Sequence, residues 1–271
     1  MVRSHDRDRF QTALFAPAGR REALFALYAF NYEIARVRES VREAMLGHIR
    51  LQWWREAIAA AFGEGPVRRH EIVEAVTTAI RECSLTREYF DRLIDTRERD
   101  LDDEPPADMA ALEDYTEGSS AAAISLALEV LGAASPVALE AARHVGIAYA
   151  LAGLIRAMPV HAQTGRSFIP ADLAANTQFD PRDYAALRPT PALRRAVETM
   201  AAAARRHLAA ARRLRHDVPT AALPALLPAR IADNALRRLE RAGFDPFSGA
   251  ASAIDPLQSW RLAYAALRRR F

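Results

Sequence analysis

Apolar residues recur at helical spacing along most of the chain. Between residues 20 and 62 they lie three or four positions apart, the spacing that collects side chains on one face of a helix. The positions that show this pattern are Ile34, Val37, Val41, Met45 and Ile49. Because Gly47 is the one weak point in this stretch, the pattern predicts one long helix or two abutting helices.

The next two stretches have the same helical character. Residues 71–99 form a second block, in which Thr86 is placed to cap a segment that begins at Arg87. Residues 109–131 then become nearly continuous in small and aliphatic side chains. This composition predicts a helix surrounded by other helices, with Gly132 at its C-terminal end.

A further apolar helix is predicted from Val137 to Met158, and Pro159 is expected to end it. Gly146 and Gly153 lie within this helix, where a missing side chain is expected to let a neighbouring helix approach closely. The residues that follow, 161–173, are expected to form an irregular excursion.

Loops and later helices complete the pattern. The segment DDEPPAD, residues 102–108, is predicted as a loop, and a long Ala/Arg helix is predicted to reach Arg215, with helices resuming near Ala229 and Pro256. The chain has no repeat of fixed period and no break in composition that marks a linker. We therefore predict an all-α protein with a single domain spanning residues 1–271, folded as a helical bundle around a central cavity.

The charge of the chain is unevenly distributed. All 37 basic residues are Arg, so chemistry that needs a lysine Schiff base, including pyridoxal phosphate chemistry, is excluded. Residues 194–271 hold 15 Arg against 6 Asp and Glu, although the whole chain carries only +3. An Arg-rich C-terminal region is suited to peripheral contact with an anionic membrane or to an acidic partner protein, and the alternative is an ordinary solvated surface.

Cellular location is inferred from what the sequence lacks. Cys83 is the single cysteine and has no CxxC partner, which fits a reducing compartment. The chain has no run of about 18 apolar residues, and its charged N-terminus does not resemble a secretory signal. We expect a cytoplasmic protein, peripheral at the inner face of the plasma membrane if it contacts a membrane.

Three segments resemble a known family in order and spacing. They are REALFALYAFNYEIARVRES, ERDLDDEPPADMAALEDYTEGSSAA and HVGIAYALAGLIRAMPVHAQTGRSFIPADL. Over residues 14–175 the chain is similar to the squalene/phytoene synthase family. That resemblance implies an α-helical bundle in which two prenyl diphosphates are joined head to head, and two facing aspartate-rich helical motifs that hold magnesium ions.

The first of these motifs is degenerate in this sequence. Its two aspartate positions align with Ala35 and Glu39, and the position of a phosphate-binding arginine aligns with Tyr32. One carboxylate of the pair is therefore lost.

The second motif is also degenerate. Its two aspartate positions align with Ala157 and His161, and the amide-bearing positions before them align with Ala150 and Gly153. Magnesium binds hard oxygen ligands, whereas an imidazole suits transition metals and alanine offers no ligand. We therefore predict no catalytic residues, no bound metal and no cofactor at these positions.

Other family positions are retained. Tyr28, Arg156 and Arg166 match the family pattern, and the resemblance implies that they preserve helix packing and the flap that closes the bundle. Together with Glu39 and His161 they are the candidate residues for a cavity or ligand site. Arg156 and His161 are predicted to recognise an anionic group such as a phosphate or carboxylate.

Within the family, the wording AFNYEIARVRESV, GHIRLQWWREAI and LIRAMPVH resembles the branch of respiratory complex I assembly factors, and suggests a bacterial relative. This resemblance implies a non-catalytic protein whose partner is a complex I subunit or assembly intermediate. One alternative is a magnesium-dependent prenyl-diphosphate transferase with its metal site rearranged onto Glu33, Glu39 and the acids of residues 98–104. Another is a carrier of an isoprenoid or lipid ligand. Nucleic-acid binding is not expected, because the arginines are spread over several helices without a known reading motif.

Several side chains that suggest chemistry also have structural explanations. The acidic cluster at residues 100–104 is expected to be a solvated loop. Adjacent Trp53 and Trp54 point in different directions on a helix, so at most one can lie centrally in the core. His144 is predicted to be a hydrogen-bonded structural residue. The C-terminal aromatic and arginine residues fit either an interfacial helix or the surface helix of an ordinary soluble protein.

Overall fold

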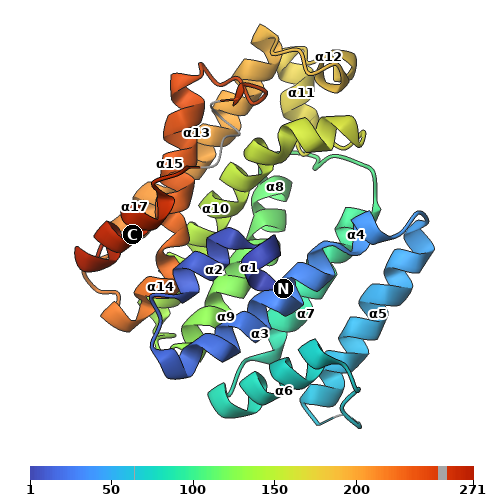
Figure 1. Ribbon diagram of the computed structural model, residues 1–271. Helices are drawn as coiled ribbons and strands as arrows, with labels where there is room; N and C mark the ends of the chain where they lie inside the picture. Colours follow the sequence, from blue (N-terminus) through green and yellow to red (C-terminus); the bar gives the residue numbers. More distant parts are fainter. Residues whose placement is uncertain (64, 250–254) are drawn as a thin grey trace.

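The computed structural model describes residues 1–63, 65–249 and 255–271, and every regular element within them is a helix, which confirms the all-α prediction. Helix α10 (Pro136–Gln163) runs through the middle of the bundle (Figure 1). On one side it packs against α13 (Pro191–Arg213) and α15 (Pro228–Arg241), and on the other it packs against α9 (Ala122–Val130). The longest apolar helix is thus enclosed by its neighbours.

By length and composition alone, α10 is the one helix in the described ranges that is apolar enough to cross a membrane, and 50% of its most apolar window is buried inside the protein. Its N-terminus follows the expected chemistry, because Ser135 accepts a hydrogen bond from the Ala138 N–H and Pro136 occupies the first turn. These features describe a central core helix.

Pro159 does not end α10, contrary to the sequence-based prediction. The helix continues through Pro159 to Gln163. A proline inside a helix removes one backbone N–H and crowds the preceding turn, but here the proline lies in the last two turns, where few further hydrogen bonds depend on it. The continuation carries His161 on the helix, whereas the sequence had suggested an irregular excursion.

The two α10 glycines differ in their surroundings. A Cβ on Gly146 would lie 2.4 Å from the Ala121 Cα, so the close approach predicted there is confirmed. A Cβ on Gly153 would meet nothing within 4 Å, so the same prediction was wrong for that position.

The stretch from residue 20 to 62 is also broken more than predicted. It forms α3 (Ala18–Ala35), the short α4 (Val37–Ser40) and α5 (Ala44–Ala61), with extended backbone at Val41 and Glu43. The apolar pattern had placed Met45 and Ile49 in the buried stripe, yet they are 67% and 58% exposed.

The buried stripe of α5 instead follows Gly47, Leu51, Trp54 and Ile58. A Cβ on Gly47 would lie 2.4 Å from Leu101 Cδ2. Gly47, which had been taken as a weak point of the helix, therefore lies where α5 closely approaches Leu101 of η1 (Arg99–Leu101).

The remaining predicted boundaries agree closely with the structure. The block from residue 71 to 99 divides into α6 and α7, and residues 109–131 form α8, a π-helical turn η2 and α9. Thr86 precedes α7 as expected, but its hydroxyl donates to Glu129 (2.5 Å) and does not cap the helix. The remaining elements are α1 (Val2–His5), α2 (Arg7–Ala13), α6 (Glu71–Cys83), α7 (Arg87–Glu98), η1 (Arg99–Leu101), α8 (Met109–Thr116), η2 (Glu117–Ala121), α11 (Ala171–Thr177), α12 (Pro181–Ala185), η3 (Thr220–Ala222), α14 (Leu223–Leu226) and α17 (Gln258–Leu267).

The two ends of the chain meet. Gln258 at the start of α17 donates to Asp8 (2.7 Å) and to Gln11 (2.9 Å) of α2, and Gln11 in turn donates to Ser259 (2.9 Å). These hydrogen bonds hold α2 beside α17, so the N-terminal helices are anchored near the bundle interior.

Candidate functional site

The first degenerate motif lies where α3 ends. Ala35 is the last residue of α3 and is partly buried, whereas Glu39 lies in the separate helix α4 and is exposed. Tyr32, at the position of the family's phosphate-binding arginine, stacks on His5 of α1 with ring centroids 4.8 Å apart. The Arg36 guanidinium lies 5.5 Å from the same ring, so α1 and Arg36 flank this position.

The second degenerate motif lies along the C-terminal half of α10. Ala150, Gly153 and Ala157 are partly buried and carry no polar side-chain atom. His161 lies in the last turn of the helix. The four aspartate positions of the two motifs therefore contribute one exposed carboxylate, that of Glu39, and one imidazole, that of His161.

Arg9 of α2 occupies the space between α3 and α10. Its guanidinium carbon lies 5.7 Å from the ring centroid of Tyr28 on α3 and 5.7 Å from that of Tyr149 on α10. Arg9 also forms a 3.0 Å ion pair with Asp6. Burial raises the pKa of the Tyr28 hydroxyl to about 12, although the nearby Arg9 charge opposes the shift.

Asp8 of α2 continues this contact. It accepts hydrogen bonds from Arg156 (3.2 Å) and from the Tyr149 hydroxyl (3.3 Å), both on α10. Because these residues belong to one connected group, we refer to them as the α2 cluster. Its members are Asp6, Asp8, Arg9, Tyr28, Tyr149 and Arg156.

A second polar group surrounds Asp100, which had been predicted to lie in a solvated loop. Its side chain is only 6% exposed, and it accepts hydrogen bonds from the Tyr115 hydroxyl (2.8 Å), Arg97 (3.1 Å) and Arg166 (3.1 Å). The prediction was wrong because the 3₁₀ turn η1 continues α7 and turns Asp100 inward before the loop begins. We refer to these four residues as the Asp100 cluster.

His161 lies beside the Asp100 cluster. Its ring packs against Phe168, with centroids 5.0 Å apart, and the Arg166 guanidinium lies 4.9 Å from the same Phe168 ring. Burial, together with the Arg166 charge, lowers the pKa of His161 to about 4, so its imidazole is neutral at pH 7. Its Nδ1 atom is buried without a hydrogen-bond partner among the described residues.

The predicted pairing of Arg156 with His161 is not seen. Arg156 is bound to Asp8 in the α2 cluster, while His161 packs against Phe168. The two side chains therefore have different partners, and the structure does not bring them together around one anion.

The residues at the motif positions do not fit magnesium. Magnesium needs several oxygen ligands in octahedral array, and Ala35, Ala157 and the neutral His161 supply none. The acids proposed for a rearranged site are dispersed, because Glu33 pairs with Arg36 (3.6 Å) and Asp103 pairs with Arg38 (2.8 Å). Within the described ranges no group of three or more His, Cys, Asp or Glu side chains is arranged to hold a metal ion.

Two expectations about aromatic side chains are confirmed. Trp54 is buried, and Trp53, which meets it edge to face at 5.0 Å, is partly exposed beside a surface pocket of about 320 Å³. His144 is hydrogen-bonded, since its Nδ1 atom lies 2.9 Å from Nδ1 of His207.

Sequence reasoning missed most of the two clusters. Arg9 and Asp8 were considered only as part of a charged N-terminus, and Arg97 was not singled out. Arg97 nevertheless gave a signal, because it follows Leu93 and Ile94 by four and three residues on the buried face of α7. A charged residue on an apolar face indicates a buried ion pair.

Comparison with known proteins gives two groups of relatives. The family model described as squalene/phytoene synthase matches residues 2–267. A protein from Mus musculus named "NADH dehydrogenase (ubiquinone) complex I, assembly factor 6" is 31% identical over 271 residues, which cover 97% of this chain and 81% of that protein. A presqualene diphosphate synthase from Rhodopseudomonas palustris is 31% identical over 175 residues, which cover 63% of this chain and 61% of the synthase.

Solved structures agree on the fold. A squalene synthase from Alicyclobacillus acidocaldarius matches with a TM-score of 0.80 at 23% identity, covering 90% of this chain and 92% of that one. A dehydrosqualene synthase matches with a TM-score of 0.85 at 15% identity, covering 98% of this chain and 93% of that one. These likenesses confirm the predicted isoprenoid-synthase-type helical bundle. The chain belongs to the squalene/phytoene synthase family.

Proposed function

We propose that this protein is a non-catalytic member of its family that assists the assembly of respiratory complex I, NADH:ubiquinone oxidoreductase. The observation that carries the proposal is the share of this chain over which each group of relatives aligns. Six relatives named as complex I assembly factor 6 or its homologues align over 94–100% of this chain. The two presqualene diphosphate synthases align over only 63% and 65% of it.

The chemistry of the motif positions supports the same proposal. Ionisation of a prenyl diphosphate needs divalent ions to stabilise the leaving pyrophosphate, and three of the four carboxylates that would hold them are replaced. The arginines nearby are committed to internal acids, Arg156 to Asp8 and both Arg97 and Arg166 to Asp100. A diphosphate would have to displace these ion pairs in order to bind there.

The partner in this proposal is a complex I subunit or an assembly intermediate. The protein would act on the cytoplasmic side, at the inner face of an energy-transducing membrane, with peripheral membrane contact through the Arg-rich C-terminal region. Neither a magnesium ion nor another cofactor is part of the proposal.

Deletion of the gene in its own organism tests the assembly role. We expect NADH-driven respiration and the amount of assembled complex I on native gels to fall, while succinate-driven respiration and isoprenoid levels stay normal. Complementation with Glu39→Gln is the matched control, because it removes the one carboxylate left in the motifs and should restore complex I fully. Unaltered complex I in the deletion strain would contradict the proposal.

A second measurement addresses catalysis directly. Purified protein incubated with farnesyl or geranylgeranyl diphosphate and magnesium should release no diphosphate. Turnover that depends on magnesium would replace this proposal with a prenyl-diphosphate transferase whose metal site is rearranged. Mass spectrometry of co-purifying lipids would identify an isoprenoid carrier if a bound isoprenoid were found in stoichiometric amount.

A further inference from the structure

The last described helix, α17, carries a line of exposed apolar side chains. Leu257, Trp260, Tyr264 and Leu267 are 53%, 77%, 58% and 81% exposed, respectively. Their spacing of three, four and three residues places them on one face of the helix. We refer to these four residues as the α17 stripe.

The stripe is not needed to hold α17 on the bundle. The opposite face buries Leu262 and Ala265 against Leu227 and Ile231. Single exposed apolar residues are ordinary, but four large ones aligned on one helix form a patch typical of an interaction site.

Positive charge accompanies the stripe. Residues 256–271 contain four arginines and no acidic side chain. Arg261 pairs with Asp255 (3.2 Å) and Arg268 lies over the Tyr264 ring at 5.5 Å. Arg269 and Arg270 form no ion pair with any other described residue. The C-terminal end of the stripe therefore presents cations that are not neutralised by neighbouring side chains.

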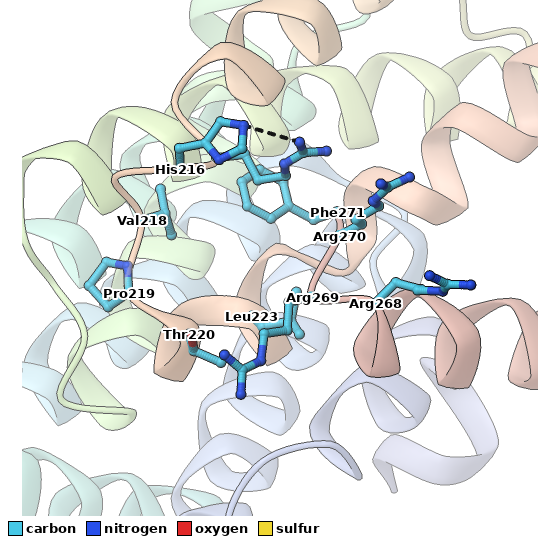
Figure 2. A pocket seen from close by; sticks show the side chains of 10 residues that line it. His216, Val218, Pro219, Thr220, Leu223, Arg268, Arg269, Arg270 and Phe271 are labelled. Atoms are coloured by element: carbon cyan, nitrogen blue, oxygen red, sulfur yellow. Dashed lines mark hydrogen bonds between the residues drawn. The ribbon is translucent and has the colours of Figure 1, made fainter.

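A pocket of about 360 Å³ opens at this end of α17. It is lined by Arg215, His216 and Thr220 on one side and by residues 268–271 on the other, and no acidic side chain is among its described lining residues. Figure 2 shows the side chains of Arg268, Arg269 and Arg270 spreading in different directions around the pocket. Several arginines thus border one pocket, and a guanidinium group suits the phosphate of an anionic lipid headgroup.

We propose that α17 lies in the headgroup region of an anionic lipid bilayer, with the α17 stripe inserted and a lipid phosphate bound in the pocket that Arg268, Arg269 and Arg270 line. Trp and Tyr favour the membrane interface, and an interfacial helix combines such an apolar face with arginines beside it. The helix lies at the edge of the molecule in Figure 1, so it can meet a flat surface without rearrangement of the bundle. The absence of acidic side chains along residues 256–271 favours an anionic surface.

This inference deepens the membrane contact of the proposed function and rests on it only for its biological setting. Lipid binding is measured on the purified protein, whereas the assembly role is measured by complex I content in cells. A failure of the lipid-binding inference is therefore distinguishable from a failure of the proposed assembly role.

Co-sedimentation of the full chain with vesicles tests the inference. One set of vesicles contains phosphatidylcholine alone and the other contains phosphatidylcholine with phosphatidylglycerol. The charge variant is Arg268→Gln/Arg269→Gln/Arg270→Gln, and its matched control is Arg3→Gln/Arg42→Gln/Arg69→Gln, which removes three exposed arginines elsewhere. The stripe variant is Trp260→Ser/Leu267→Ser, matched by Met45→Ser/Ile49→Ser on α5.

Wild-type protein should bind the phosphatidylglycerol vesicles and release them as salt is raised. Each arginine at an anionic surface contributes about a fivefold gain in affinity, so the charge variant should bind roughly 100-fold more weakly. The stripe variant should also lose binding, and both controls should retain it.

Equal binding of the wild type to both kinds of vesicle, or equal loss in the matched controls, would overturn the inference. If the wild type bound no vesicles but the charge variant failed to associate with a complex I intermediate, the surface would be a protein-docking site and the lipid assignment would be wrong.

Discussion

Asp8 accepts a 3.2 Å hydrogen bond from Arg156, which joins the N-terminal helix α2 to the helix that carries the second degenerate motif. The Asp8 side chain is 14% exposed and the Arg156 side chain 37%. In this chain, therefore, the arginine retained from the family pattern is paired with an internal carboxylate.

A double-mutant cycle of Asp8→Ala and Arg156→Ala should show a coupling free energy of about 1–2 kcal/mol, because the pair is partly shielded from water. Urea unfolding of the four proteins measures it. The surface pair Arg188–Asp183, with side chains 72% and 32% exposed, is the control and should couple by less than about 0.5 kcal/mol. Equal coupling in both cycles would mean that the Asp8–Arg156 pair stabilises the protein no more than an exposed ion pair does.

Asp100→Asn should lower the free energy of unfolding by about 3 kcal/mol, because it leaves two largely buried arginines, Arg97 and Arg166, without their carboxylate. Asp102→Asn, two residues later in the exposed loop, should change it by less than about 0.5 kcal/mol. Thermal or urea unfolding distinguishes them. If the two variants were equally stable, the ion pairs of Asp100 would contribute no more to stability than those of a solvated acid in the loop.

Alanine substitutions at the two glycines of α10 should change the stability of the protein in opposite directions. Gly146→Ala should destabilise the protein by about 1–3 kcal/mol, because the new methyl group would collide with the Ala121 backbone. Gly153→Ala should stabilise it by about 0.5–1 kcal/mol, because open space surrounds that position and alanine favours the helix. Melting temperatures of the two variants check the signs, and a stabilised Gly146→Ala would refute the close approach of η2.

Acidification should destabilise the protein through His161. Its pKa is lowered from 6.5 to about 4 in the folded chain, so the unfolded chain takes up the proton first as the pH falls. The free energy of unfolding should therefore be constant above about pH 6.5 and fall by an amount of the order of 2 kcal/mol between pH 6.5 and pH 4.

The His161→Gln variant should lose much of this pH dependence, which urea unfolding at pH 7 and pH 5 measures. His144→Gln is measured alongside, because burial and the neighbouring His207 also lower the pKa of His144. An unchanged pH dependence in His161→Gln would show that His161 is protonated freely in the folded state.

The helices and their order were predictable from apolar spacing, and the family was predictable from three quoted segments. The predictions that failed concern local features, such as a helix end or a buried face, that depend on tertiary contacts. From the sequence alone, Pro159 is predicted to end its helix, yet α10 continues through it. Met45 and Ile49 are predicted to be buried, yet the face of α5 that carries Gly47 packs on Leu101 instead. The periodicity of apolar residues predicts that a helix exists, but it does not predict which of two candidate faces packs against the core.

The motif positions were predictable one by one, but the two clusters were not. Asp8 and Arg156 are 148 residues apart, and Asp100 and Arg166 are 66 apart. Such pairs form only when the bundle closes, so a single sequence gives their residue types without their partners. The one usable signal was a charge such as Arg97 on an otherwise apolar helix face.

The contact between α2 and α17 has a consequence for the order of events during synthesis. Gln258 donates a hydrogen bond to Asp8, which lies 250 positions earlier in the chain, and a ribosome adds about 5–20 residues per second. The N-terminal helices must therefore wait roughly 10–50 s for the segment that completes their hydrogen bonds. Until then Asp8 and Gln11 lack their hydrogen bonds to Gln258, and a chaperone would meet this face of α2 before α17 covers it.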